Sequence, residues 1–214
     1  MLPVRDKALT RLTHQAIILW AGPKHSGKTS SAARLVEEAR NRGFIVAGCL
    51  APSVYAGDVL RGFDLVNLRS GRRAPLARRA IEPRQDRSFH FLPDGLSLGE
   101  ESLGPPATKD ADLIIVDEYG PRELKSHLWR RATDRLMTST DAVLLLIVRE
   151  ELVGEVLRLY EGPATRKLAA LAPESVDEVL TLLENRCRLS SQPSEAREPA
   201  ADSVRDPEAE RRME

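Results

Sequence analysis

Residues 22–29 read GPKHSGKT, and this stretch decides the fold. It satisfies the pattern GxxxxGK[ST] at every fixed position. The apolar run 16–20 precedes it and predicts a strand, and apolar residues at helical spacing follow it over 29–42. A strand, a glycine-rich loop and a helix in this order form the phosphate cradle of nucleotide-binding α/β proteins. We therefore predict an α/β fold that binds a nucleoside triphosphate.

The residue types of this loop fit the chemistry of phosphate binding. Its backbone must turn so that the N–H groups point at the α- and β-phosphates, and glycine leaves room for that approach. Lys28 is expected to reach the β- and γ-phosphates as a catalytic residue, and Thr29 to offer its hydroxyl to Mg²⁺. Ser30 adds a hydroxyl near the α-phosphate, and we assign no catalytic role to His25. The predicted nucleotide-binding residues are Gly22, Pro23, Lys24, His25, Ser26, Gly27, Lys28, Thr29 and Ser30.

An acidic pair follows the apolar run at 112–117, which has the composition of a strand buried on both faces. Proteins with a phosphate loop place their second Mg²⁺ residue at such a strand end, and Asp117 is the candidate. Glu118 lies one residue further. It could polarise an attacking water as a general base if burial raises its pKa. The alternative is an acidic pair that only caps a strand at the surface.

The segment between these two motifs predicts a strand and a hairpin. Residues 44–50 follow the end of the first helix and predict a second strand, which completes a βαβ unit. Apolar and polar residues alternate over 53–68 on both sides of a turn signal at 56–58. This alternation predicts an inserted antiparallel hairpin with an exposed tip. Residues 71–93 are rich in Arg and lack regular apolar spacing, so we assign them as a loop.

The second half of the chain predicts one more central strand and several helices. Residues 142–148 form another run typical of a strand buried in a parallel sheet. Pro121 suits the first position of a helix that would end before residue 141, and a further helix is expected over 152–161. Residues 175–183 predict a final strand, although a buried helical segment would show the same short apolar pattern.

Length and composition favour one nucleotide-binding domain over residues 1–189. Residues 190–214 are rich in Ser, Pro, Glu, Ala and Arg, and they predict a disordered tail. The 32 Lys and Arg residues equal the 32 Asp and Glu residues, so no overall charge favours nucleic acid. No apolar run reaches the roughly 20 residues of a membrane span, and we expect a cytoplasmic protein without membrane contact. The tail or the hairpin could contact a protein partner.

Three segments together resemble the small THEP-type nucleoside triphosphatases. They are GPKHSGKTS at 22–30, RGFDL at 61–65 followed by Ser70-Gly71, and LIIVDEYGPRELKS at 113–126. In that family a phosphate loop, a hairpin and such an acidic motif follow in this order. The resemblance implies a RecA-like three-layer fold with a mainly parallel sheet of order 5-1-4-3-2. It also implies Mg²⁺-dependent hydrolysis of NTP, including ATP and GTP.

Several further residues are weaker candidates. Asn185 and Arg186 resemble an element near the end of those proteins that would approach the nucleotide. Arg149 follows a central strand, at the edge where ligands of α/β sheets bind, and could sense the γ-phosphate. Arg61 and Arg72 could stabilise phosphate charge from the hairpin. Surface salt bridges would explain such arginines equally well.

Two other functions remain open on the sequence alone. A nucleotide or nucleoside kinase would use the same cradle, with an acceptor in place of water and the hairpin as a lid. A nucleotide-switched regulatory protein would bind the nucleotide tightly and turn it over little. No NKxD motif indicates guanine, so the base specificity is open. Release of phosphate from NTP without an added acceptor distinguishes hydrolysis from the two alternatives.

Overall fold

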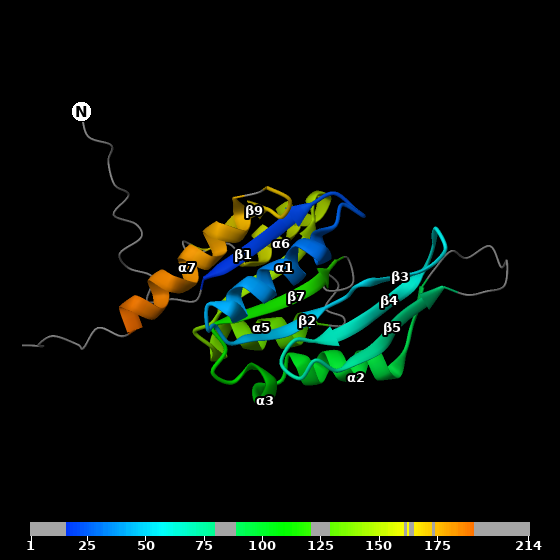
Figure 1. Ribbon diagram of the computed structural model, residues 1–214, viewed down its shortest axis with the longest axis horizontal. Coiled ribbons are helices and arrows are strands. Elements are labelled where there is room, and N and C mark those ends of the chain that lie inside the picture. The colour runs from blue at the N-terminus through cyan, green and yellow to red at the C-terminus, as the bar shows by residue number, and fades with distance from the viewer. Residues whose placement is uncertain are drawn as a thin grey trace, which may run out of the picture.

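The computed structural model describes residues 16–79, 89–120, 129–160, 162, 165–172 and 174–190. Its centre is a mixed sheet whose strands follow the order β6-β5-β4-β2-β7-β8-β1-β9, with β3 paired to β4 (Figure 1). The parallel strands are β1 (Ile17–Gly22), β2 (Val46–Leu50), β7 (Leu113–Tyr119), β8 (Val143–Arg149) and β9 (Thr165–Ala169). Numbered along the chain, these five strands lie in the order 5-1-4-3-2, which confirms the predicted topology.

An antiparallel extension continues the sheet beyond β2. The predicted hairpin is present as β3 (Ser53–Ala56) and β4 (Val59–Asn67), and its turn is exposed. The assignment of 71–93 as a loop is wrong over 73–79 and 89–93, because β5 (Arg73–Arg79) and β6 (Phe89–Phe91) extend the sheet and α2 begins at Pro93, while residues 80–88 lie outside the described residues. Pairing of β5 with β4 overrides the poor local pattern. The pairing skips one residue of β5, since Phe63 pairs with Ala77 and Asp64 with Pro75, and such an irregularity tolerates the missing N–H of Pro75.

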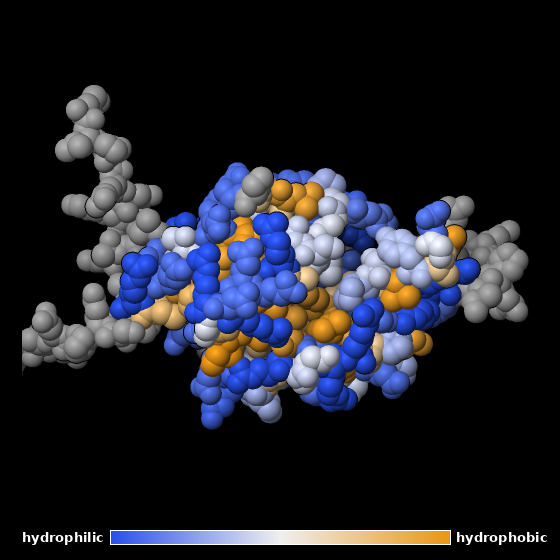
Figure 2. Space-filling view, viewed as in Figure 1, coloured by the Kyte–Doolittle hydropathy of each residue, from blue (hydrophilic) through white to orange (hydrophobic). Residues whose placement is uncertain are grey.

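Two helices cover one face of the sheet. They are α1 (Lys28–Asn41) and α7 (Ser175–Ser190), and both lie in front of the strands in Figure 1. Residues with mainly hydrophilic side chains cover this side of the two helices in Figure 2. The predicted strand at 175–183 is wrong and the helical alternative is correct, because Val176, Val179, Leu180 and Leu183 are buried at helical spacing. The last strand is β9, an edge strand whose polar sequence gives little strand signal.

The other face carries α2 (Pro93–Ser102), α5 (Arg130–Ser139) and α6 (Val153–Tyr160), with the short α3 (Pro105–Thr108) and the 3₁₀ helix η2 (Glu150–Leu152). The helix expected over 152–161 is thus confirmed as α6. The helix expected from Pro121 is confirmed only as α5, since residues 121–128 lie outside the described residues. Of the predicted tail at 190–214, Ser190 is the last residue of α7, and residues 191–214 lie outside the described residues. Within the described part, no helix is both long and apolar enough to span a bilayer.

Strands β7 and β8 form the centre of the core, as their apolar composition predicts. Side chains of β7 alternate between two buried clusters, one against α1 and α7 and the other against α2, α5 and α6. Complete burial of each Leu, Ile or Val side chain stabilises the fold by about 1.5–3 kcal/mol relative to exposure. The strand ends that carry the candidate site are therefore anchored in the buried core of the sheet.

Candidate active site

The phosphate loop turns through left-handed backbone conformations. His25 has φ 60° and Gly27 has φ 89°, and α1 begins directly afterwards at Lys28. Gly27 caps the helix and makes no side-chain hydrogen bond to its first N–H groups. A Cβ on Gly22 would lie 3.3 Å from Ser26 Oγ, which shows how tightly the loop closes. This backbone is built to receive an anion.

Lys28 reaches back across the loop. Its Nζ donates hydrogen bonds to Gly22 O at 3.1 Å and to Pro23 O at 2.6 Å. Burial lowers the pKa of Lys28, and the carboxylates of Glu118 and Asp117 oppose that effect. The ammonium group therefore lies against the loop backbone, where the charges of both acidic residues act on it.

Asp117 connects the loop to the acidic strand. Its carboxylate accepts hydrogen bonds from Thr29 Oγ1 at 2.8 Å, from the Ala51 amide at 2.9 Å and from the Glu118 amide at 2.8 Å. The side chain is almost fully buried, and this burial raises its pKa although the three hydrogen bonds oppose the rise. Sequence reasoning missed the Ala51 amide, because a backbone donor after β2 leaves no signal in residue type.

Glu118 occupies a β-bulge. Val116 pairs with Leu146 and Tyr119 with Val148, so β7 has one more residue here than β8. The backbone of Glu118 lies in this bulge and has φ 55°, a left-handed conformation that non-glycine residues rarely adopt. Burial raises the pKa of its carboxyl group, Asp117 raises it further, and Arg149 opposes both.

Arg149 comes to the same edge from β8. Its Nη2 lies 4.0 Å from Glu118 Oε2, and both side chains remain about one-third exposed, at 32% and 40%. The charge of Arg149 also acts on Lys28 and His25, whose pKa values it helps to lower. The structure therefore gathers the loop, the acidic pair and one arginine at the carboxyl ends of β1, β7 and β8.

A comparison with known families decides the assignment of this site. The model of the NTPase family matches residues 17–181, which include the loop, the acidic pair and Arg149. The chain belongs to the NTPase family. It is a nucleoside-triphosphatase, and hence a hydrolase, as the resemblance of its three motifs implied.

Relatives of this NTPase agree with the assignment. It is 36% identical over 139 residues to the nucleoside-triphosphatase THEP1 of Methanothermobacter thermautotrophicus. The aligned region covers 63% of this chain and 76% of that relative. The solution structure of a human cancer-related nucleoside triphosphatase aligns with TM-score 0.55 and 23% identity, over 84% of this chain and 100% of that one. The crystal structure of THEP1 from Aquifex aeolicus aligns with TM-score 0.58 and 20% identity, over 79% of this chain and 99% of that chain. At these identities the two structures support the fold alone.

Three of the weaker arginine candidates are not joined to the site. Arg72 pairs with Glu101 of α2 at 2.7 Å, so its guanidinium stabilises the contact between sheet and helix. Arg186 donates to Asp141 O, just before β8 begins, which places it at the amino edge of the sheet. Arg61 is exposed on β4, in the hairpin that extends beyond the carboxyl edge in Figure 1, and no described contact links it to the loop.

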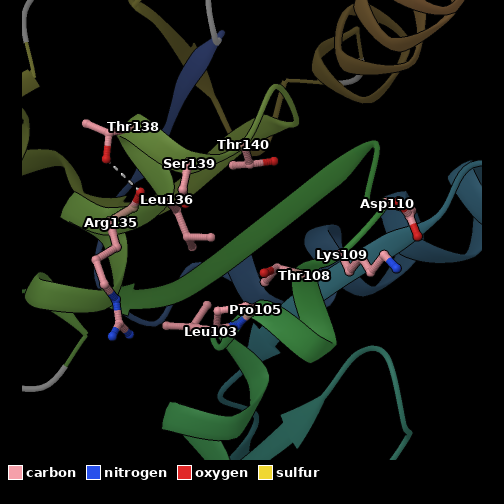
Figure 3. Close-up of a pocket in the computed structure, with 10 residues that line it drawn as sticks. All are labelled: Leu103, Pro105, Thr108, Lys109, Asp110, Arg135, Leu136, Thr138, Ser139 and Thr140. Atoms are coloured by element: carbon pink, nitrogen blue, oxygen red, sulfur yellow. Dashed lines mark hydrogen bonds between the residues drawn. The ribbon is translucent and has the colours of Figure 1, made fainter.

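Arg186 therefore lies at the opposite edge of the sheet from the phosphate loop, and the approach of Asn185 and Arg186 to the nucleotide stays a prediction. Both lie near the carboxyl end of α7, and this helix runs in the same direction as α1, away from the phosphate loop (Figure 1). A cavity of about 520 Å³ also opens at the amino edge, between α3 and α5 (Figure 3). It is lined by residues such as Thr108, Arg135 and Thr140, and it contains none of the residues of the phosphate loop.

Proposed function

We propose that this NTPase transfers the γ-phosphoryl group to water with Glu118 as the general base. The observation that carries the proposal is the 2.8 Å hydrogen bond between Thr29 of the loop and Asp117 of the acidic strand. It joins the two halves of the site and leaves Glu118, the next residue, at the edge beside Lys28 and Arg149. Burial and the neighbouring Asp117 carboxylate raise the pKa of Glu118, which favours acceptance of a proton.

The proposed reaction uses each group once. The amides of the loop and Lys28 hold the β- and γ-phosphates, and Arg149 faces the charge that develops on the γ-phosphoryl oxygens. A water oxygen forms a bond to the γ-phosphorus while the bond to the β–γ bridging oxygen breaks, and Glu118 accepts the proton of the water. The products are a nucleoside diphosphate and inorganic phosphate. ATP, GTP and other triphosphates are the proposed substrates, since the cradle contacts phosphate.

Mg²⁺ fits the residues that converge at the loop. The Thr29 hydroxyl and the Asp117 carboxylate are hard oxygen donors 2.8 Å apart. Among the described residues, no cluster of three or more His, Cys, Asp or Glu side chains could hold a metal by itself. This suits Mg²⁺, which binds to proteins through one or two side chains together with substrate phosphates. When bound, Mg²⁺ would neutralise the charge shared by the β- and γ-phosphate oxygens.

Two substitutions separate binding from cleavage. Lys28→Ala removes the charge that faces the phosphates and should abolish binding of a fluorescent ATP analogue. Glu118→Gln keeps the shape of the side chain and should bind the analogue normally, yet lower the rate of phosphate release by about 10²-fold or more. Glu155→Gln on the exposed side of α6 is the matched control and should behave as the wild type.

The substrate panel tests the choice of acceptor. Phosphate release is measured with ATP, GTP, CTP and UTP in the presence of Mg²⁺, with and without added nucleosides and nucleoside monophosphates. Hydrolysis by water requires release without any acceptor. Normal turnover in Glu118→Gln would rule out its role as a base, and dependence on an added acceptor would favour a kinase.

A further inference from the structure

A chain of hydrogen bonds runs away from the active site directly behind Glu118. The hydroxyls of Tyr119 and Tyr160 lie 2.6 Å apart, and their rings meet edge to face at 6.1 Å between centroids. Tyr160 in turn donates to Asp134 Oδ1 at 2.7 Å. Arg130 holds the same carboxylate through Nε at 2.8 and 2.9 Å and lies over the Tyr160 ring, 5.6 Å from its centroid. These four residues join the end of β7 to α6 and α5.

The direction of the hydrogen bonds follows from the donors available. Tyr160 has one hydroxyl proton and donates it to Asp134, so Tyr119 must be the donor in the bond between the two tyrosines. Each oxygen then has a defined role, and the order runs from Tyr119 through Tyr160 to Asp134. Such a network has one preferred arrangement, because a Tyr160 proton turned towards Tyr119 would leave the Tyr160 oxygen and the Asp134 carboxylate, two acceptors, facing each other without a proton.

This network lies where Glu118 needs support. Glu118 has φ 55°, and a strained backbone persists only where its surroundings determine it fully. On one side Asp117 is held by its bonds to Thr29 and to the Ala51 amide. On the other side Tyr119 is 1% exposed, packed in the core and hydrogen-bonded to Tyr160. The strained residue is thus held between two fixed neighbours.

We propose that Tyr119, Tyr160 and Asp134 are positioning residues that hold the carboxylate of Glu118 in its catalytic orientation. The inference rests on the proposed role of Glu118 as general base. Tyr160 ends α6, the helix that follows Arg149 through η2, so the network also connects the segments that carry the two charged groups. Because none of the three is expected to contact the nucleotide, their loss should slow cleavage and leave nucleotide affinity unchanged.

Removal of single hydroxyls tests this separation. Tyr160→Phe and Tyr119→Phe should each lower kcat about tenfold, since displacement of a catalytic group by a fraction of an ångström costs that order. KM for ATP and the Kd of a fluorescent ATP analogue should stay within about twofold of the wild type. Tyr55→Phe, which removes the same atom from the exposed hairpin, should change neither. Asp134→Ala provides a third variant that keeps both rings, removes the acceptor of the Tyr160 hydroxyl and should match Tyr160→Phe.

A double-mutant cycle distinguishes the failure of this inference from that of the proposed function. In the Glu118→Gln background, Tyr160→Phe should have no further effect on kcat, because the group that it positions is already disabled. A tenfold loss in both backgrounds would overturn the positioning role. Unchanged kcat in the folded Tyr119→Phe, Tyr160→Phe and Asp134→Ala variants would overturn it as well. If Glu118→Gln itself turned over normally, the proposed function would fail first.

Discussion

Arg149 offers a perturbation whose effects on stability and on catalysis should differ greatly. Two unit charges at 4.0 Å, the distance between Arg149 Nη2 and Glu118 Oε2, attract each other by about 1 kcal/mol in water and about 4 kcal/mol at an effective dielectric constant near 20. Both side chains are about one-third exposed, so the lower value applies, and measured exposed pairs stabilise proteins by roughly 0.2–1 kcal/mol. Arg149→Gln should therefore lower the free energy of unfolding by about 1 kcal/mol or less.

The same substitution should have a much larger effect on turnover. Loss of one donor that faces charge developing in the transition state costs about 10²–10³-fold in kcat, and we expect about 10²-fold here. The pH profile should change as well. Glu118 must be ionised to accept a proton, so kcat falls as the pH falls through its pKa, which burial and Asp117 raise above the usual glutamate range. Arg149 opposes that rise, so its removal should move the acid limb to higher pH.

The assay combines phosphate release at saturating ATP across pH with thermal unfolding of each variant. Arg42→Gln is a suitable control, because Arg42 pairs with Glu184 at 2.7 Å with similar exposure and joins α1 to α7. Arg42→Gln should lower the free energy of unfolding by as little as Arg149→Gln does, and it should leave kcat unchanged. Arg149→Lys should recover part of the phosphate-release activity that Arg149→Gln loses. An Arg149→Gln enzyme with unchanged kcat, or with an acid limb at lower pH, would refute the reasoning.

Two further predictions concern the metal and the core. Thr29→Ala should raise the Mg²⁺ concentration needed for half-maximal phosphate release, and excess EDTA should stop phosphate release by the wild type. If the rate of phosphate release stayed the same after both changes, the proposed role of Mg²⁺ would be excluded. Gly48→Ala should destabilise the fold by about 3 kcal/mol or more in urea unfolding, because Gly48 has φ 94° and a Cβ there would lie 2.0 Å from Ile115 O. Gly154→Ala, at an exposed position of α6 with nothing within 4 Å of the added Cβ, should instead raise the free energy of unfolding by about 0.5–1 kcal/mol.

The parts of this structure that sequence predicts well carry local signals. The loop at 22–29 has fixed spacing, and the runs at 112–117 and 142–148 are apolar enough to be buried on both faces. Strand β5 carries no such signal. Its Arg73 and Arg78 suit a strand only because both pair with Asp64 on the neighbouring β4. A partner that lies elsewhere in the chain supplies what the local pattern lacks.

The helix at 175–190 illustrates a second limit. The short apolar run at 175–183 suits either a strand or a buried helix, and periodicity over so few residues does not separate them. Tertiary contacts decide between strand and helix here, because one side of α7 packs against the sheet face that β1 and β8 form. The resemblance that associates Arg186 with the nucleotide does not give the direction of this helix, on which the position of Arg186 depends.

The geometry of the acidic pair depends on strand register, which the residues 117–118 do not encode by themselves. In a regular strand the side chains of Asp117 and Glu118 would point to opposite faces, and only one could serve the loop. The extra residue in β7 changes this. Asp117 stays on the face of α1, where it meets Thr29, and Tyr119 returns to the face of α5 and α6. Glu118 is left between them at the edge of the sheet. Its role as a base therefore depends on the bulge, and the bulge on what holds Asp117 and Tyr119 in place.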